Sequence, residues 1–219
     1  MDAIECINTR MSVRGFRQEP IPHDLLVKVL EAALRSPSYK NSQPWEVAVV
    51  SGAKRDALAR VLVDMAAQNV ADAPDIPHPD SWPATNDARI KQHANLRCHA
   101  IGLDLSDPEQ RTQAKLDNFR FFGAPTVIFL YQDSSLSDWS VFDMGLFCQT
   151  LMLAANAYGF GTVPQAFLTN YPQIVKNFLN IPDSKRLVLG ISIGYPDLQH
   201  KANSFKSQRA DFSEVVTFY

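Results

Sequence analysis

Residues 37–45 read Pro-Ser-Tyr-Lys-Asn-Ser-Gln-Pro-Trp. Apolar residues recur at helical spacing before this stretch, and the apolar run Val47–Val50 follows it, so it predicts a connection from a helix to a buried strand. Pro37 and Pro44 each fix one backbone φ angle and disfavour helix at the preceding residue, which stiffens the loop. Its serine, asparagine and glutamine side chains can donate to and accept from the edge of a flat polar ligand. The alternative interpretation is an ordinary surface turn bracketed by prolines.

The rest of the chain alternates between helical and extended patterns around this loop. Strands are expected at Val47–Val50, Thr126–Tyr131 and Leu187–Ile193, with a short extended piece at Thr162–Ala166. Helices are expected at 2–10, from Pro22 to near Arg35, and at 53–68, 87–103, 141–157 and 172–179, with one more after Pro108. The proline-rich segment 69–86 predicts a long irregular loop, and loops of this length are usually lids or insertions. No repeat or linker divides the chain, so we expect one α+β domain over residues 1–219.

Two segments of the chain are so apolar that each must be buried against another part of the protein or against a partner. The expected helix 141–157 is apolar nearly all round, which indicates burial on several sides, in a core or at a subunit interface. The tail 198–219 ends in Val215, Val216, Phe218 and Tyr219. An apolar tail after the last core strand predicts packing against a sheet edge, in this subunit or in another.

Composition excludes several classes of protein. The chain has 219 residues, 46% hydrophobic and 20% charged, with a net charge of −2 and a pI of about 6.2, so no basic field would recruit nucleic acid. No run of about 18 apolar residues predicts a membrane span, and the acidic start lacks the features of a signal peptide. The three cysteines are widely spaced and odd in number, which favours reduced thiols in a cytoplasmic protein.

A second candidate site stands at the end of the first expected helix. Arg10, Arg14 and Arg17 alternate with small and hydroxyl residues, including Ser12. Guanidinium groups match the geometry of phosphate oxygens, and a serine adds a hydroxyl donor, so the segment is a candidate anion cradle. The alternative interpretation is a set of solvated charges at a helix end.

No protein-based chemistry is evident elsewhere in the sequence. The glycine-rich phosphate loops, the nucleophile elbow and the metalloprotease pattern are absent, and the histidines show no metal-ligand spacing. A serine-histidine arrangement could still assemble in space. An enzyme built on this chain would therefore rely on a cofactor for its chemistry, and we expect neither a catalytic side chain nor a metal.

Four segments, taken together, resemble the nitroreductase family of FMN-dependent flavoproteins. They are Arg10–Phe16, the loop Pro37–Trp45, the segment Gly159–Ala166, and Arg209 in the tail. Asn118–Pro125, Pro164–Ala166 and Gly194–Asp197 are similar to the branch of nitrobenzoate-type reductases. The resemblance implies a central mixed β-sheet flanked by helices, in a homodimer with domain-swapped C-terminal arms, residues 198–219. It places two FMN sites at the dimer interface.

The resemblance also implies roles for particular residues. The FMN phosphate is expected to be bound by Arg10, Ser12, Ser207 and Arg209, and the N1/O2 edge of the flavin by Arg14. The flavin of the other subunit is expected to be reached by Pro37, Ser38, Tyr39, Asn41 and Gln43. Pro164, Gln165 and Ala166 are expected against the ring near N5, with a backbone amide as donor.

Two departures from the family pattern limit this transfer. Many members carry an acidic residue or a glycine where this chain has Gln165-Ala166, which questions any side-chain role there. A further polar contact to the pyrimidine edge is expected from the middle of the chain, where Arg89 and Lys91 are candidates.

The implied activity is reduction of a nitroaromatic, quinone or related conjugated acceptor by NADPH or NADH through FMN, in a ping-pong cycle. The loop 69–86, with Trp82, would cap the pocket. Two alternatives remain open at this point. The same FMN scaffold could serve an oxidase, flavin-consuming or dehalogenating reaction, or the protein could be a non-catalytic flavin-binding dimer.

Overall fold

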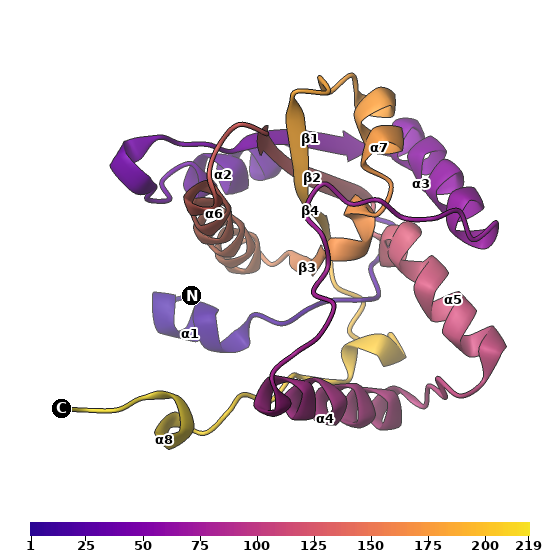
Figure 1. Cartoon of the computed structure of the whole chain (residues 1–219), viewed down its shortest axis with the longest axis vertical. Helices are drawn as coiled ribbons and strands as arrows, with labels where there is room; N and C mark the ends of the chain where they lie inside the picture. The colour runs from indigo at the N-terminus through magenta and orange to yellow at the C-terminus, as the bar shows by residue number, and fades with distance from the viewer.

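A computed structural model describes all residues from 1 to 219 and is built on one four-stranded sheet with the strand order β1-β2-β4-β3 (Figure 1). The strands are β1 Glu46–Ser51, β2 Thr126–Asp133, β3 Gly161–Gln165 and β4 Lys185–Gly194. All three strand pairings are antiparallel. The expectation of a mixed sheet is therefore wrong for this chain, whose one parallel pairing is the isolated bridge between Ser12 and Thr162. The α+β class is confirmed.

The chain forms eight α-helices. They are α1 Ala3–Thr9, α2 His23–Ala33, α3 Gly52–Ala67, α4 Ala84–Ile101, α5 Pro108–Phe119, α6 Asp138–Ala157, α7 Pro172–Leu179 and α8 Phe212–Val215. None of them combines the length and the apolar character needed to cross a membrane. The helices expected from the sequence are all present, with ends that differ by a few residues.

Side chains of β2 alternate between two cores, one on each face of the sheet. Val127 and Phe129 pack with residues of α3, α5 and α7, whereas Ile128 and Leu130 pack with residues of α2 and α6. Because both faces of this central strand are covered, its sequence is apolar without interruption, as predicted. The sheet thus lies between two helical layers.

Strand β1 differs from its expected environment. It lies at one edge of the sheet, and of its six residues only Val50 is buried. Val49 is 39% exposed. The apolar run that indicated a buried strand is therefore a half-covered edge strand, held in place by the buried Trp45 stacked on Phe147 at a centroid distance of 5.0 Å.

The loop 69–86 is fixed against the sheet end rather than hinged over a pocket. The Asp75 carboxylate accepts from the Leu187 backbone N–H at 2.7 Å and pairs with the buried Lys176 ammonium at 3.2 Å. Asp72 accepts from the Asn170 side-chain amide at 3.0 Å. Trp82 is half exposed and lines neither of the two larger cavities of the molecule. The first half of the loop therefore forms a strap, and the capping role of the loop stays a prediction.

Helix α4 and the C-terminal tail form a separate edge of the molecule, at the bottom of Figure 1. Arg89 of α4 pairs with Glu214 of α8 at 2.8 Å, so the tail lies along its own α4. The fit is loose, because a cavity of about 630 Å³ lies between the two segments. Beyond α8 the chain extends away from the body, and Phe218 is 84% exposed.

Candidate functional site

The segment after α1 lies along the free edge of β3. The Val13 backbone N–H donates to the Thr162 carbonyl at 3.0 Å. Gly161 permits this approach, since a Cβ placed on it would lie 2.8 Å from the Val13 Cβ atom. The cradle segment predicted from the sequence is therefore fixed to the sheet by its backbone, which leaves the polar side chains around it free for a ligand.

A small recess of about 50 Å³ opens between this segment and the tail. Its lining residues are Arg10, Met11, Ser12, Arg14, Phe205, Lys206, Ser207 and Arg209. The four residues predicted for a phosphate, which come from opposite ends of the sequence, thus meet in one chain. Lys206 was not predicted, and its ammonium donates to the Asn8 carbonyl at 2.6 Å.

The recess concentrates positive charge without matching acids. None of the three arginines in it forms an ion pair with a carboxylate of the chain. Burial, and then the charge of Arg209, lowers the pKa of Arg10. Cations grouped in this way favour binding of an anion, whose charge would offset their repulsion.

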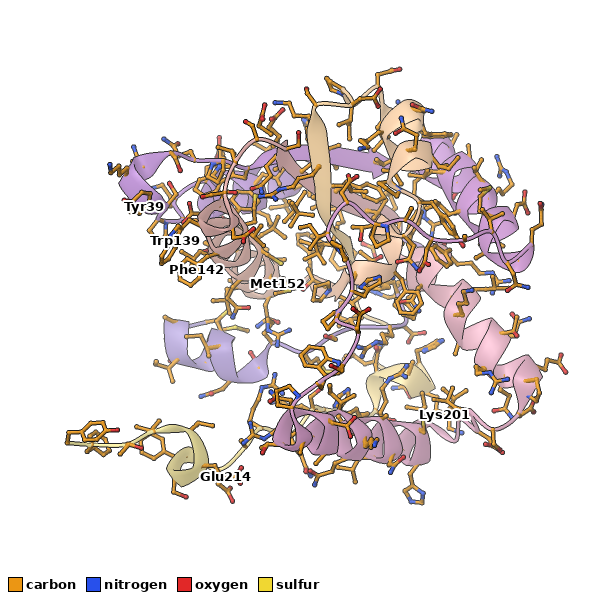
Figure 2. The ribbon with its side chains drawn as sticks, viewed as in Figure 1. Tyr39, Trp139, Phe142, Met152, Lys201 and Glu214 are labelled. Carbon is orange, nitrogen blue, oxygen red and sulfur yellow. The ribbon has the colours of Figure 1, made fainter.

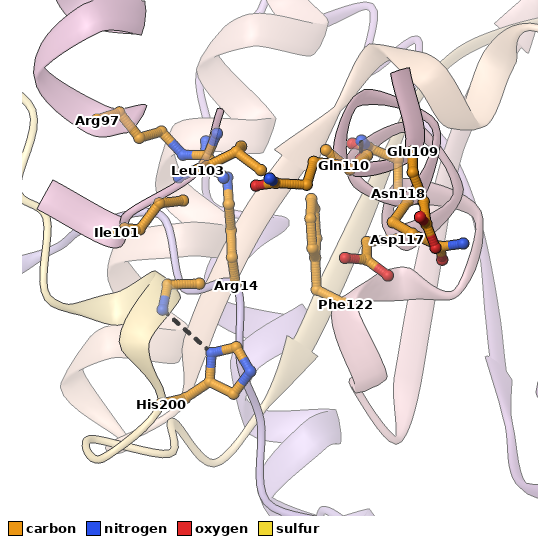
Figure 3. Close-up of a pocket in the computed structure, with 13 residues that line it drawn as sticks. Arg14, Arg97, Ile101, Leu103, Glu109, Gln110, Asp117, Asn118, Phe122 and His200 are labelled. Carbon is orange, nitrogen blue, oxygen red and sulfur yellow. Dashed lines mark hydrogen bonds between the residues drawn. The ribbon is translucent and has the colours of Figure 1, made fainter. Parts of the chain in front are cut away.

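Arg14 is held by its backbone and points into a second, larger cavity (Figure 3). Its N–H donates to the Asn203 side-chain oxygen at 2.7 Å, and the Asn203 amide donates to the Gly15 carbonyl at 2.8 Å. Burial, and then the charge of Arg97, lowers the pKa of Arg14 to about 10. The Arg14 guanidinium carbon also lies 6.0 Å from the centre of the Phe122 ring.

This larger cavity, named by comparison with the recess, has a volume of about 480 Å³ and lies between the end of α4, the α5 helix and the tail. It is distinct from the space of about 630 Å³ between α4 and the tail. Its lining residues are Arg14, Arg97, Ile101, Leu103, Glu109, Gln110, Gln113, Ala114, Asp117, Asn118, Phe122, His200 and Ala202. This size is within the usual range for small-molecule sites, about 300–1,000 Å³. Since Arg14 lines both spaces, the cavity and the recess adjoin.

The end of β3 presents its backbone, not its glutamine, to the outside. The Gln165 side chain is 3% exposed, accepts from the Ser192 hydroxyl and donates to the Asn118 carbonyl at 3.0 Å. Pro164 is half-buried and Ala166 is exposed. A side-chain role for Gln165 toward a ligand is therefore excluded in this conformation, and Pro164 and Ala166 are the outward-facing members of the predicted trio.

The loop 37–45 lies far from the recess in the same chain. Figure 2 places Tyr39 at the opposite side of the molecule from Lys201 and Glu214. The loop is tightly folded, because Lys40, Asn41 and Gln43 all have positive φ angles. Such non-glycine strain is concentrated at functional segments. Thus the predicted residues Pro37, Ser38, Tyr39, Asn41 and Gln43 do not complete the recess within one protomer.

Several side chains around the site differ from the sequence expectations. Arg89 pairs with Glu214, and Lys91 pairs with Asp87 at 2.7 Å, so neither enters the larger cavity. Arg97 of the same helix does enter it. No feature of the sequence singled out Arg97, because α4 has weak apolar periodicity and no fully buried residue to fix which side faces inward.

A recess lined by cations that adjoins a cavity of about 480 Å³ is an arrangement typical of proteins that bind small molecules. The chain belongs to the nitroreductase family, whose family model matches residues 7–195. It is 34% identical over 204 residues to a 4-nitrobenzoate reductase of Pseudomonas putida, covering 93% of this chain and 89% of that protein. Nitroreductase NfnB of Mycolicibacterium smegmatis is 34% identical over 213 residues, covering 97% of this chain and 90% of NfnB.

The fold of this chain is similar to solved structures over nearly its whole length. The crystal structure described as the FMN-dependent nitroreductase NfnB from Mycobacterium smegmatis in complex with NADPH has a TM-score of 0.95 at 33% identity, covering 99% of this chain and 97% of that one. An FMN- and NADPH-dependent NfnB from a sphigopyxis strain also has a TM-score of 0.95, at 27% identity, covering 100% of this chain and 99% of that one. The tail and α4 are therefore part of the shared fold.

Proposed function

We propose that this protein is an FMN-dependent oxidoreductase that uses NADPH or NADH to reduce nitroaromatic, quinone or related conjugated acceptors. The observation that carries the proposal is the convergence of Arg10, Ser12, Ser207 and Arg209 on one recess. Relatives described as FMN-dependent and as NADPH complexes support the choice of cofactor and donor.

The recess suits a phosphate monoester. Four cationic side chains and two hydroxyls line about 50 Å³, enough for one compact anion. Arginine donors match phosphate oxygens in pairs, and a dianion would offset both the burial and the neighbouring charge of Arg209 that lower the pKa of Arg10. We assign Arg10, Ser12, Ser207 and Arg209 to the FMN phosphate, and Lys206 as an additional cation.

Bound FMN would supply the redox chemistry, namely hydride acceptance from NAD(P)H and electron delivery to the acceptor in a ping-pong cycle. The residues of the chain would bind the FMN and orient it. The Arg14 guanidinium would lie at the N1/O2 edge, where a positive charge favours the reduced ring. Pro164 and Ala166, at the exposed end of β3, would face the ring near N5, and Gln165 would hold this strand end from inside.

The proposal includes a homodimer in which residues 1–219 act as one FMN-binding domain per protomer. None of the loop residues 37–43 lines the recess of its own chain, so they would serve the flavin of the other subunit. Tyr39, Trp139 and Phe142 form an exposed aromatic cluster, 58%, 65% and 60% exposed, beside this loop. The tail as far as Arg209 would stay at the recess of its own chain, and its exposed end beyond α8, where Phe218 is 84% exposed, would pack on the partner. Three free cysteines are compatible with the cytoplasm as its location.

The visible spectrum tests the proposal. Purified protein should carry, or take up, one FMN per chain, and its flavin bands should bleach under anaerobic NADPH or NADH and return when a nitroaromatic or quinone is added. Protein that binds no FMN would contradict the cofactor assignment. Bound FMN that neither nicotinamide reduces would contradict the enzyme assignment and favour a flavin-binding dimer.

A further inference from the structure

Tyr39, Trp139 and Phe142 form one exposed group of rings, called the aromatic cluster below. Tyr39 stacks on Trp139, and Trp139 meets the Phe142 ring edge-on, with ring centroids 6.2 Å apart in both pairs. More than half of each side chain is exposed. Single exposed aromatic residues are common, but a contiguous apolar patch marks an interaction site. Aromatic side chains are also enriched at the centre of protein interfaces.

The aromatic cluster has a fixed shape before any partner binds. Trp139 and Phe142 are three residues apart in α6 and therefore share one face of this helix. The loop that carries Tyr39 is tied to α6, because the Tyr39 backbone N–H donates to the buried Asp143 carboxylate at 3.1 Å. Groups that are already ordered lose little entropy on binding. The aromatic cluster is thus preorganised for a contact.

Helix α4 is a second part of the chain that lacks cover. It has 18 residues, and none of them is buried. Helices in folded proteins gain most of their stability from packing one face against other elements. Here the tail runs beside α4, held by the ion pair between Arg89 and Glu214, and a cavity of about 630 Å³ remains between the two segments. We call this space the α4–tail cavity.

The walls of the α4–tail cavity suit aromatic rings. Leu96 comes from α4 and Val215 from α8, and both are exposed in the single chain. The Phe205 ring lies 5.4 Å from the His93 ring on the same wall. Burial, and then the charges of nearby arginines, lowers the pKa of His93, so its ring is neutral at pH 7. A space of this size holds a ligand of several rings, since small-molecule sites measure about 300–1,000 Å³.

The two uncovered surfaces have matching neighbours. Phe205 and Arg209 line both the phosphate recess and the α4–tail cavity, so these two spaces adjoin. On the other surface, the loop 37–43 adjoins the aromatic cluster through Tyr39. No member of the aromatic cluster lines the α4–tail cavity of its own chain. In the proposed dimer, a loop that reaches the partner's recess brings the aromatic cluster to the partner's α4–tail cavity.

We propose that Trp139 and Phe142 of each protomer insert into the α4–tail cavity of its partner. This inference rests on the homodimer of the proposed function, and the two-fold symmetry of such a dimer makes the contact twice. It gives the partner a part in ligand binding beyond the loop 37–43. Helix α4 carries Arg97 into the larger cavity, so a partner that covers α4 also fixes one wall of that cavity.

Photo-crosslinking of the full-length, FMN-loaded protein tests the contact directly. Trp139 is replaced by p-benzoylphenylalanine, the protein is irradiated, and the covalent dimer is mapped by mass spectrometry. The adducts should lie in α4 or in residues 205–215 of the second copy. The matched control carries the same group at Trp82, which is half exposed and lines neither of the two large cavities. It should give no adduct in the α4–tail cavity.

Subunit exchange between labelled and unlabelled copies, followed by native mass spectrometry, measures the strength of the contact. Trp139→Ala should speed exchange at least about tenfold, as expected when a central aromatic residue of an interface is truncated. Leu96→Gln should also speed exchange, although this exposed residue supports nothing in its own chain. In the double variant the two effects should not add, because both substitutions remove the same contact. Trp82→Ala is the control and should leave the rate unchanged.

Two results would overturn the inference. One is a dimer without adducts from position 139 in α4 or residues 205–215, and the other is fully additive effects of Trp139→Ala and Leu96→Gln. Either result in protein whose FMN is still reduced by NADPH would leave the proposed activity intact. A dimer that gives the expected adducts but binds no FMN would instead contradict the proposed function and leave the contact standing. A monomer with reducible FMN would overturn the homodimer and the contact together.

Discussion

Both carboxylate oxygens of Asp143 accept from the backbone N–H of Tyr39, at 3.1 and 3.2 Å. Asp143 is 3% exposed in the first half of α6, so this contact ties a strained surface loop to the core. It is a charge-assisted hydrogen bond with no cation nearby to compete for the carboxylate.

Replacing this anchor should loosen the loop. In Asp143→Ala the free energy of unfolding should fall by about 1.5–3 kcal/mol, the usual value for a hydrogen bond to a charged group. For a chain of this size that lowers Tm by about 4–10 °C, measurable by calorimetry. Asp138→Ala, at the exposed start of α6, should have a smaller effect. Equal losses in the two variants would mean that the contact with Tyr39 contributes nothing specific.

The phosphate recess predicts a difference between two flavins. Arg209→Gln should weaken FMN binding about 10- to 100-fold, because one charge-assisted contact is lost, and should leave riboflavin, which lacks the phosphate, unaffected. Fluorescence titration with each flavin gives both constants. Arg60→Gln, an exposed cation on α3, is the control. If riboflavin binding falls in parallel with FMN binding, Arg209 acts on the fold or the ring and not on the phosphate.

Gln165 should matter for stability and not for turnover. Gln165→Met removes the bonds to Ser192 and Asn118 and leaves the fully buried Ser192 hydroxyl without its acceptor. We expect a loss of about 2–4 kcal/mol in unfolding free energy, with kcat unchanged. Adding Ser192→Ala should recover part of the loss, since both polar partners are then gone. A double variant as unstable as the sum of the single ones would argue against this pairing.

Burial raises the pKa of the Cys148 thiol from 9.0 to about 11, against the opposing effect of Arg10. Between these values the thiol ionises in the unfolded chain and stays protonated in the fold, so stability should fall as pH rises from 9 to 11. The stability present below pH 9 and lost across this window is at most about 2–3 kcal/mol.

Two measurements check this prediction. The stability difference between wild type and Cys148→Ala should shrink as pH rises through the window, and other titrating groups cancel in that difference. At pH 8.5 iodoacetamide should modify Cys98, which is half-buried on α4, before Cys148. Rapid labelling of Cys148 in the folded protein would show that the thiol is accessible and ionised.

Most helices and strands could be predicted from local sequence patterns, because these elements depend mainly on residues close by in the sequence. The apolar run in β2 requires cover on both faces wherever the strand lies, and Pro172 starts α7 in any context. Strand β1 was misjudged because its edge position follows from the strand order, which its own residues do not encode. The strap formed by Asp75 depends on Lys176, a partner about one hundred residues away.

Some residues of the candidate site could also be predicted from the sequence, and others could not. Arg10, Ser12 and Arg209 could be named in advance because the family pattern fixes their spacing, and the structure brings them together. Arg97 could not be named, since its direction is set by how α4 meets the end of α5. Asp143 is the one acid inside the apolar expected helix 141–157, and a lone acid in such a helix is the sequence signal for a buried polar contact.

Pro164 has a consequence for solubility. It lies in β3, at the outer edge of the sheet, two residues beyond the bridge between Ser12 and Thr162, where a strand would normally offer its N–H groups to another chain. A proline has no N–H to offer, so a foreign strand cannot continue the sheet through this position. The residue proposed to face the flavin ring therefore also guards this edge against aggregation by strand addition.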